Sequence, residues 1–349
     1  MISSLFKSKK ELFGLDIGSN SVKIVELKKG RKDYKVKKLG IKKIPKETII
    51  DGAIMDSVSL TDAIRELVAE IKPSAKNVAL SVSGQSVIVK KISVPIVTEE
   101  EFANSIQWES EQYLPFSIQD VFVDFKILGA TENIQGQMDV LLVAAKKDLI
   151  NDYLLVIREL GFEPVVVDID VFAIQNMFEI NYPNLTNKIN LLCNIGASFT
   201  NINITKSGDS LFTRTVNVAG NRVTEALQKN LSISFDEAED IKLGLNKGFD
   251  EMQVREIIDE EVNVVTGEIQ RTIDFFYNTN PNDIIENVVL FGGTSLLTSL
   301  PERLKSKSGI NVILGNPFTN IPLDSKTTLA NYTQYGVSVG LGIRRLGDK

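Results

Sequence analysis

The amino-acid sequence predicts an α/β protein built from two similar lobes, with a smaller α+β unit inserted into the first lobe. The first observation is a strand–turn–strand segment at residues 12–27, and the second is a repeat of its pattern at residues 191–204. The third is a buried strand that ends in the pair Gly292 and Gly293. Two half-chains that start with one motif indicate a duplication with pseudo-two-fold symmetry.

The first strand–turn–strand segment has the features of a phosphate-binding hairpin. Apolar residues alternate again after the turn, at Val22, Ile24 and Leu27, so the element that follows is a strand. The P-loop and the dinucleotide-binding loop both open a helix instead. Backbone N–H groups of a tight turn can converge on one concavity that suits phosphate oxygens. The turn residues here are Gly18, Ser19, Asn20 and Ser21.

The second segment repeats the first in the same order of residue types. Asn194 stands where Asp16 ends the first strand, and Gly196 stands where Gly18 opens the first turn. A carboxylate at Asp16 can hold a magnesium ion through water. Each segment alone also fits an ordinary hairpin with a glycine-containing turn. Their recurrence favours a ligand held between two facing hairpins.

The Gly292-Gly293 pair is expected to lead from the buried strand into a helix that is capped by Thr294 or Ser295. Glycines at such a turn let the backbone approach a flat ligand closely. The helix N-terminus adds partial positive charge. We interpret this segment as the third part of one ligand cleft.

An acidic helix is predicted at residues 236–243. Glu239 and Lys242 lie three residues apart and share a face of this helix. The commonest meaning of this spacing is a surface ion pair.

Residues 78–159 alternate strands and helices in a way that predicts a semi-independent unit. Strands are predicted at 78–83, 87–94, 121–128 and 138–145, and a helix at 147–160. Thr98 and Glu101 form a capping box for another helix, which Pro115 ends. We expect the aromatic residues of this stretch to pack in the core of the unit. They are Trp108, Tyr113 and Phe116.

Composition excludes several classes of chemistry. The 349 residues are 43% hydrophobic and 24% charged, which is ordinary for a globular protein. Histidine is absent, so neither a Ser–His–Asp triad nor a His-ligated zinc site can form within the chain. A single cysteine, Cys193, excludes an internal disulfide. With no apolar stretch of ~20 residues and no signal-peptide pattern, we expect a cytoplasmic protein.

The charge distribution argues against nucleic acid as a partner, because the net charge is −6. One exception is the lysine- and arginine-rich stretch at residues 28–46. It fits either a surface that faces anionic lipid headgroups or the solvated edge of a β-hairpin. The sequence favours the solvated edge, since charge runs usually mark solvated faces.

The order of hairpin, second hairpin and strand–Gly-Gly resembles the phosphate 1, phosphate 2 and adenosine segments of the actin/Hsp70/sugar-kinase superfamily. Within it the chain resembles the PilM family, the cytoplasmic actin-like proteins of type IV pilus assembly. The segment from Trp108 to Phe116 carries this closer resemblance. Further matching segments lie at residues 14–27, 168–176, 292–295, 316–318 and 335–344.

This resemblance implies the actin-like, ribonuclease H-like duplicated fold. The first lobe would comprise residues 1–77, 160–185 and 328–349, and residues 78–159 would form the inserted subdomain. The second lobe would comprise residues 186–327, with its own insertion at about 223–284. The division protein FtsA carries a comparable insertion in its first lobe.

The resemblance also implies that ATP or ADP binds in the cleft with Mg²⁺. The first phosphate contacts would come from Gly18, Ser19, Asn20 and Ser21, with Lys23 nearby and Asp16 on the magnesium side. The second phosphate loop would be Gly196, Ala197 and Ser198. Glu239 and Lys242 would contact the ribose or base, and the adenosine would be flanked by Gly292, Gly293 and Thr294.

One departure concerns hydrolysis. Many superfamily members carry Asp where this chain has Asn194. An amide can still hydrogen-bond a coordinated water, but it has no charge with which to hold the cation or orient an attacking water. We therefore expect nucleotide binding with weak or absent ATPase activity.

The function that the resemblance implies is a nucleotide-binding scaffold at the inner membrane. It would bind the cytoplasmic N-terminal tail of a PilN-like membrane protein in a groove beside the inserted unit. Other inner-membrane and motor components of the pilus would be further partners, and self-association stays open.

Two alternative functions share the fold. A small-molecule kinase would use Asp168 or Asp170 as a base, although Asn194 counts against efficient phosphoryl transfer. An FtsA-like division protein would need a membrane-binding amphipathic helix, and residues 342–349 show no such pattern.

Overall fold

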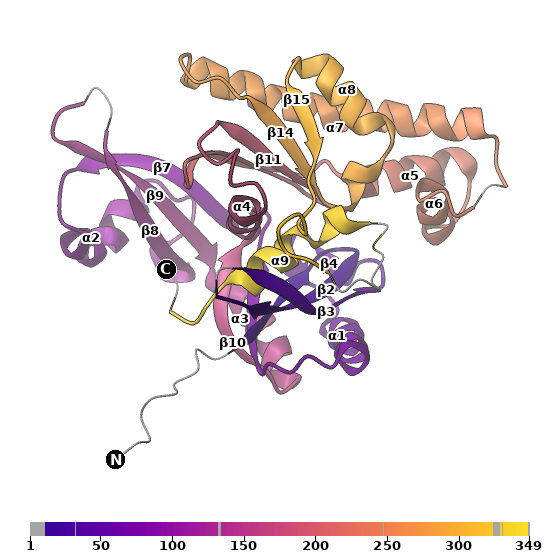
Figure 1. Cartoon of the computed structure of the whole chain (residues 1–349), viewed down its shortest axis with the longest axis horizontal. Helices are drawn as coiled ribbons and strands as arrows, with labels where there is room; N and C mark the ends of the chain where they lie inside the picture. Colours follow the sequence, from indigo (N-terminus) through magenta and orange to yellow (C-terminus); the bar gives the residue numbers. More distant parts are fainter. Residues whose placement is uncertain are drawn as a thin grey trace.

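The computed structural model describes residues 11–31, 33–131, 134–246, 248–323, 329 and 331–347. Its two largest sheets have five strands each and share one topology (Figure 1). The first sheet has the order β3-β2-β1-β6-β10, and the second has the order β13-β12-β11-β14-β15. In each sheet the first strand pairs antiparallel with the second and parallel with the fourth (β1 with β2 and β6, β11 with β12 and β14). The predicted duplication of an α/β unit is confirmed.

The strands of the first sheet are β1 (Leu12–Ile17), β2 (Ser21–Lys29), β3 (Tyr34–Lys43), β6 (Asn77–Val82) and β10 (Glu163–Ile169). Those of the second sheet are β11 (Asn190–Ile195), β12 (Thr200–Lys206), β13 (Asp209–Val216), β14 (Asn287–Phe291) and β15 (Asn311–Leu314). Helices cover both faces of each sheet, so the central strands are buried on both faces and read as nearly continuous apolar runs.

The outer faces of the two sheets carry different helices. The first sheet packs against α1 (Ser57–Ile71) and α3 (Lys147–Glu159). The second packs against α7 (Glu251–Thr279) and α8 (Ser299–Ser308). Each pair of helices contributes apolar side chains to the core of its own sheet. The chain therefore has two separate outer cores.

A third core joins the two sheets through α4 (Asp170–Asn181) and α9 (Gly336–Ile343), which lie between them in Figure 1. It combines Leu12 of the first sheet with Leu192 of the second and apolar residues of both helices. The two helices cross closely at Gly340, where a Cβ atom would lie 1.8 Å from the carbonyl oxygen of Ala173. This position therefore accepts only glycine, and the close crossing brings the two sheets together.

A separate three-stranded sheet forms the inserted unit, with β9 (Gln137–Lys146) between β7 (Val87–Pro95) and β8 (Val121–Ala130). Helix α2 (Glu99–Glu111) packs on it through Phe102, and the predicted capping box of Thr98 and Glu101 is present. The Thr213 hydroxyl of β13 donates to the Val89 carbonyl at 3.2 Å. The inserted unit therefore also contacts the second sheet.

The pairing of β6 affects the limits of the inserted unit. This strand pairs with β1, and α3 contributes Ile157 to the core of the first lobe. The expected unit at residues 78–159 contained both elements. We propose narrower limits for it, at about residues 84–146, and the division of the chain into domains stays a prediction.

Two expectations from the sequence are wrong. Trp108 is 79% exposed on α2 instead of packed in the core, while Tyr113 is half-buried against the core of the inserted unit. Thr294 and Ser295 do not cap a helix. They lie within a short 3-10 turn, η2 (Gly293–Leu296), and the following helix α8 begins later, at Ser299.

The remaining elements are short or lie on the second lobe. Helices α5 (Gly220–Leu231) and α6 (Phe235–Lys242) pack with α7 around Val223, Leu227 and Ile257. The short elements are β4 (Ile49–Ile50), β5 (Ala53–Ile54), η1 (Ile118–Asp120) and η3 (Tyr332–Tyr335). Among the helices that the structure describes, none is long and apolar enough to cross a membrane.

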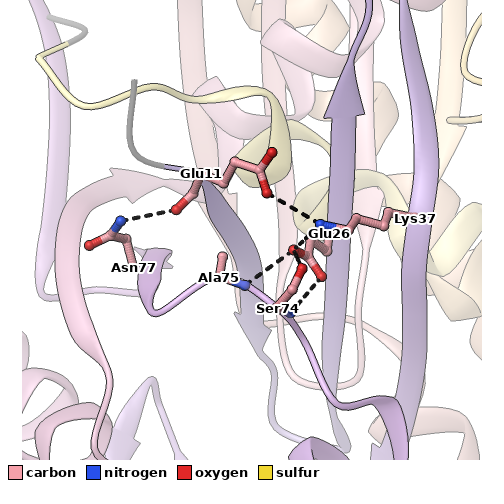
Figure 2. A network of polar contacts seen from close by, with 6 residues as sticks. All are labelled: Glu11, Glu26, Lys37, Ser74, Ala75 and Asn77. Carbon is pink, nitrogen blue, oxygen red and sulfur yellow. Dashed lines mark hydrogen bonds and ion pairs between the residues drawn. The ribbon is translucent and has the colours of Figure 1, made fainter. Parts of the chain in front are cut away.

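A buried carboxylate ties the first sheet to the connection between α1 and β6 (Figure 2). Glu26 of β2 is 1% exposed and accepts hydrogen bonds from the Ser74 backbone N–H at 3.0 Å and the Ser74 hydroxyl at 2.6 Å. Lys37 of β3 lies 3.2 Å from both Glu26 and Glu11. Burial by itself raises the pKa of Glu26, but the Ser74 hydrogen bonds and Lys37 outweigh it. The pKa therefore lies below its ordinary value of 4.5.

We expect Glu26→Gln to lower the free energy of unfolding by about 1–3 kcal/mol at neutral pH, because it removes a charged acceptor from buried donors. The lowered pKa means that the stabilisation is present above pH 4.5 and is lost as the pH falls through the folded-state pKa. Urea denaturation should therefore show wild type and variant converging in acid. Glu66→Gln, which removes an exposed partner of Lys42, is the control and should change stability little. An equal effect of both variants would contradict the role of Glu26.

Candidate functional site

A cleft of about 1250 Å³ lies between the two sheets. Every residue for which the sequence implied a ligand contact lines it. These residues come from the β1–β2 turn, the β11–β12 turn, α6 and the segment after β14. The structure thus brings together parts of the chain that are far apart in sequence, while their contacts with a ligand stay a prediction.

The two hairpin turns facing the cleft have one geometry. In the first, Ile17 pairs with Val22, and the Gly18 N–H donates to the Ser21 carbonyl at 3.1 Å. In the second, Ile195 pairs with Thr200, and the Gly196 N–H donates to the Phe199 carbonyl at 2.9 Å. The same register and the same closing hydrogen bond make the turns equivalent.

Neighbouring segments brace the second turn. Its Gly196 carbonyl accepts from the Gly220 N–H at 3.1 Å and from the Thr294 hydroxyl at 2.7 Å. Gly292 has φ +87°, and a Cβ atom there would lie 2.2 Å from the Ile195 carbonyl oxygen. Only glycine fits, so η2 can lie directly against the end of β11.

A buried ion pair lies beside the first turn. The Lys23 ammonium of β2 is 3.1 Å from the Asp16 carboxylate of β1, and about nine-tenths of each side chain is buried. The ammonium is also 3.4 Å from the Ser21 carbonyl oxygen. The pair holds one positive and one negative group at the floor of the cleft, next to the backbone of the turn.

A second carboxylate reaches the cleft at Asp170, the first residue of α4. It accepts from the Ser81 hydroxyl at 2.6 Å and from the Asn201 amide at 3.3 Å. Burial, and next the charge of Asp16, raise the pKa of Asp170 to about 6. Asp16 and Asp170 both line the cleft.

Asp168, the other acid considered as a base, does not line the cleft. It lies 3.6 Å from the Arg344 guanidinium, and burial raises its pKa. At the edge of the sheet where β6 and β10 end, Asp168 of β10 lies opposite Ser81 of β6, and Ser81 is the one of the two that lines the cleft. The parallel strands β1, β6 and β10 all end at this edge of the sheet. Ligands commonly bind at the carboxyl ends of parallel strands, so this strand pattern could have identified Ser81 and Asp170 as site residues.

The Glu239–Lys242 pair is buried, so the expected surface ion pair is wrong. The side chains of Glu239 and Lys242 are 7% and 10% exposed. Thr224 of α5 donates to Glu239 and accepts from the Lys242 ammonium at 2.8 Å. Burial lowers the pKa of Lys242, although Glu239 opposes this change. The pair presents a fixed charge couple to the cleft.

The sequence did not indicate the apolar end of the cleft. Side chains of the α6–α7 region and of the segment after η2 line it, including Leu243, Leu245, Phe249, Ile258 and Leu297. Leu245 is 72% exposed. An apolar wall next to charged and backbone groups suits a ligand that combines a flat ring with anionic groups.

Two sheets of one topology, with equivalent hairpins facing a shared cleft, define the actin-like class of two-lobed proteins. The chain matches the family model of the type IV pilus assembly protein PilM over residues 14–346 and belongs to this family. It is also similar to a chain of a solved PilM–PilN type IV pilus biogenesis complex, with 26% identity and a TM-score of 0.85. That similarity covers 96% of this chain and 98% of the other.

Two more distant structures share only the fold. The ethanolamine utilization protein EutJ from Carboxydothermus hydrogenoformans is 16% identical, with a TM-score of 0.56 over 95% of this chain and 88% of that one. MreB5 of Spiroplasma citri bound to ADP is 13% identical, with a TM-score of 0.53 over 95% and 94%. The actin-like fold expected from the sequence is thereby confirmed.

We expect Glu239→Leu to destabilise the protein by about 3–5 kcal/mol, because it leaves the buried Lys242 ammonium without its counter-charge. The double variant Glu239→Leu/Lys242→Met removes both charges and should recover most of the loss. Urea denaturation of the three proteins measures both effects. If the pair were exposed, the single and double variants would have nearly the same free energy of unfolding as wild type. That result would contradict the buried geometry.

Proposed function

We propose that the chain is a nucleotide-binding scaffold of type IV pilus assembly that binds the cytoplasmic N-terminal segment of a PilN-like inner-membrane protein. The observation that carries the proposal is the full-length similarity to a chain of the PilM–PilN complex. Membership of the PilM family over residues 14–346 supports it. The proposed place for the peptide is beside the inserted unit.

The proposed nucleotide is ATP or ADP, and the shape and charge of the cleft support it. Two equivalent turns line the cleft from opposite lobes, and the backbone N–H groups of such turns suit a chain of phosphates. Lys23 adds a positive charge beside the first turn. The apolar end around Phe249 and Leu297 suits a purine, and the Glu239–Lys242 pair lies where it can hydrogen-bond a ribose or base.

Magnesium is proposed to enter with the nucleotide. Asp16, Asp170 and Asn194 line the cleft, and their side-chain oxygens are the type of ligand that Mg²⁺ prefers. Within the described part of the chain, no group of three or more acidic or cysteine side chains is placed to hold a metal ion. Mg²⁺ commonly binds through one or two carboxylates together with substrate phosphates and waters, so two carboxylates fit this mode. The charge of the cation would also relieve the repulsion that raises the pKa of Asp170.

The cleft is proposed to hold nucleotide with little turnover. Asn194 ends β11, in the position that Asp16 has on β1, and its amide is neutral. It therefore cannot supply the second charged group that would polarise a water for attack. The proposed effect of the bound nucleotide is instead to set how the two lobes lie relative to each other and to the inserted unit, which contacts both lobes.

The proposed location is the cytoplasmic face of the inner membrane, reached through protein partners. A PilN-like protein is the first of these, and other inner-membrane and motor components of the pilus are further candidates. Self-association of the chain is compatible with the same role.

We predict that Gly18→Val or Asp16→Ala weakens ATP–Mg²⁺ binding by roughly tenfold or more. A valine at Gly18 would project toward the Ser21 carbonyl and the Lys23 ammonium, 3.3 and 3.7 Å from its Cβ, and so fill the phosphate cradle. Asp16→Ala removes a carboxylate proposed for the magnesium side. Isothermal titration with ATP–Mg²⁺ measures the change, and circular dichroism verifies folding. Asp274→Ala, on the exposed face of α7, is the control, and unchanged affinity in both cleft variants would refute the site.

We predict that a synthetic peptide with the cytoplasmic N-terminal sequence of the PilN-like partner co-purifies with the chain. The comparison uses apo protein and protein with ATP–Mg²⁺, and a peptide of scrambled sequence is the control. Binding of the native peptide without binding of the scrambled peptide supports the proposed scaffold function. Loss of binding in both nucleotide states, or strong stimulation of ATP turnover by a sugar or acetate, would overturn it.

A further inference from the structure

The turn between β2 and β3 carries an uncompensated cluster of positive charge, here called the basic tip. It consists of Lys28, Lys29, Arg31 and Lys35, all of them exposed. None of the four forms an ion pair with an acidic side chain of the described residues. The neighbouring acid is Asp33, whose side chain lies against Gly30 within the turn.

Cross-strand pairing concentrates this charge. Lys28 pairs directly with Lys35, which places two ammonium groups on adjacent strands. Like charges at opposed positions of a sheet are destabilising. Three lysines elsewhere on the same sheet have partners: Lys23 pairs with Asp16, Lys37 with Glu11 and Glu26, and Lys42 with Glu66. Lys38 and Lys43 of β3 form no ion pair with the described acids, but each lies opposite a residue that is not basic. At the basic tip, by contrast, the repulsion between Lys28 and Lys35 is left in place, in a chain of net charge −6.

Other basic and amphipathic groups gather at the same end of the sheet. The Tyr34 ring lies near two cations, the Lys29 ammonium at 5.6 Å from its centre and the Arg345 guanidinium at 5.2 Å from its centre. Leu346, the next residue, is 50% exposed. Because β1 runs antiparallel to β2, its start lies beside the end of β2.

We propose that the basic tip docks the protein on an anionic membrane surface. Clustered lysines and arginines bind acidic headgroups electrostatically. A tyrosine ring flanked by cations and an exposed leucine have the amphipathic character of side chains at the membrane interface. Nucleic acid is the less suitable polyanion, since its binding requires a broader basic face than this single hairpin end, and the chain as a whole is acidic.

This docking is independent of nucleotide binding. The basic tip lies at the end of β2 opposite to the Gly18–Ser21 turn, because β2 begins at that turn and ends at Lys29. Changes at the tip therefore leave the cleft intact. A failure of lipid binding would accordingly leave the proposed scaffold function standing, and the reverse also holds.

The test is co-sedimentation of the full chain with vesicles of phosphatidylcholine containing about one-third phosphatidylglycerol. The variant Lys28→Gln/Lys29→Gln/Arg31→Gln/Lys35→Gln is expected to lower the partition coefficient on the order of 1000-fold. The matched control removes four other exposed lysines that form no ion pair with the described acids, as Lys206→Gln/Lys229→Gln/Lys305→Gln/Lys307→Gln. It should bind like wild type, and all three proteins should bind ATP equally.

The outcomes of this experiment distinguish an anionic membrane surface from nucleic acid as the partner of the basic tip. Wild-type binding to the anionic vesicles that weakens with added salt and with the tip variant supports the proposal. Three outcomes would overturn it: no binding of wild type to anionic vesicles, equal binding to pure phosphatidylcholine, or equal loss in the tip and control variants. Retention of labelled duplex DNA by wild type but not by the tip variant, without vesicle binding, would assign the surface to nucleic acid instead.

Discussion

The close crossing of α4 and α9 is the constraint on which the cleft depends. Gly340 lies so near the Ala173 carbonyl that no side chain fits between the helices. Gly14 of β1 also lies close to α9, where a Cβ atom would be 2.3 Å from the Ser338 carbonyl oxygen. The core around these contacts takes apolar side chains from both sheets. Because protein interiors are close-packed, this core sets the separation of the sheets and thereby the distance across which the two hairpin turns face one another.

The electrostatics of the cleft follow from this placement. Asp16 with Lys23, and Glu239 with Lys242, are buried ion pairs on opposite lobes. Buried pairs are weak contributors to stability, and their retention next to a cavity points to a role in binding. Asp170 adds a carboxylate whose raised pKa reflects burial and the nearby Asp16. A ligand that brings both phosphates and a cation would match these charges. Phosphates without a cation would leave the carboxylates uncompensated, and a cation without phosphates would leave the lysines uncompensated.

The inserted unit shows where local patterns predicted structure and where they did not. The capping box at Thr98 and Glu101 depends on neighbours three residues apart, so the sequence located that helix start correctly. Whether Trp108 is buried depends on which face of α2 meets the sheet, and Phe102 occupies that face. The assignment of β6 to the first sheet depends on pairing with β1 across more than sixty intervening residues.

The sequence by itself determined the elements and the duplication, because strand alternation, turn glycines and caps act over a few residues. It also indicated both hairpin turns and the family, since those signals lie in contiguous segments. Only the tertiary structure decided that Asp170 enters the cleft while Asp168 does not, and that Glu239 and Lys242 are buried. These outcomes depend on how separate elements pack, and burial then sets the strength of every charge interaction among them.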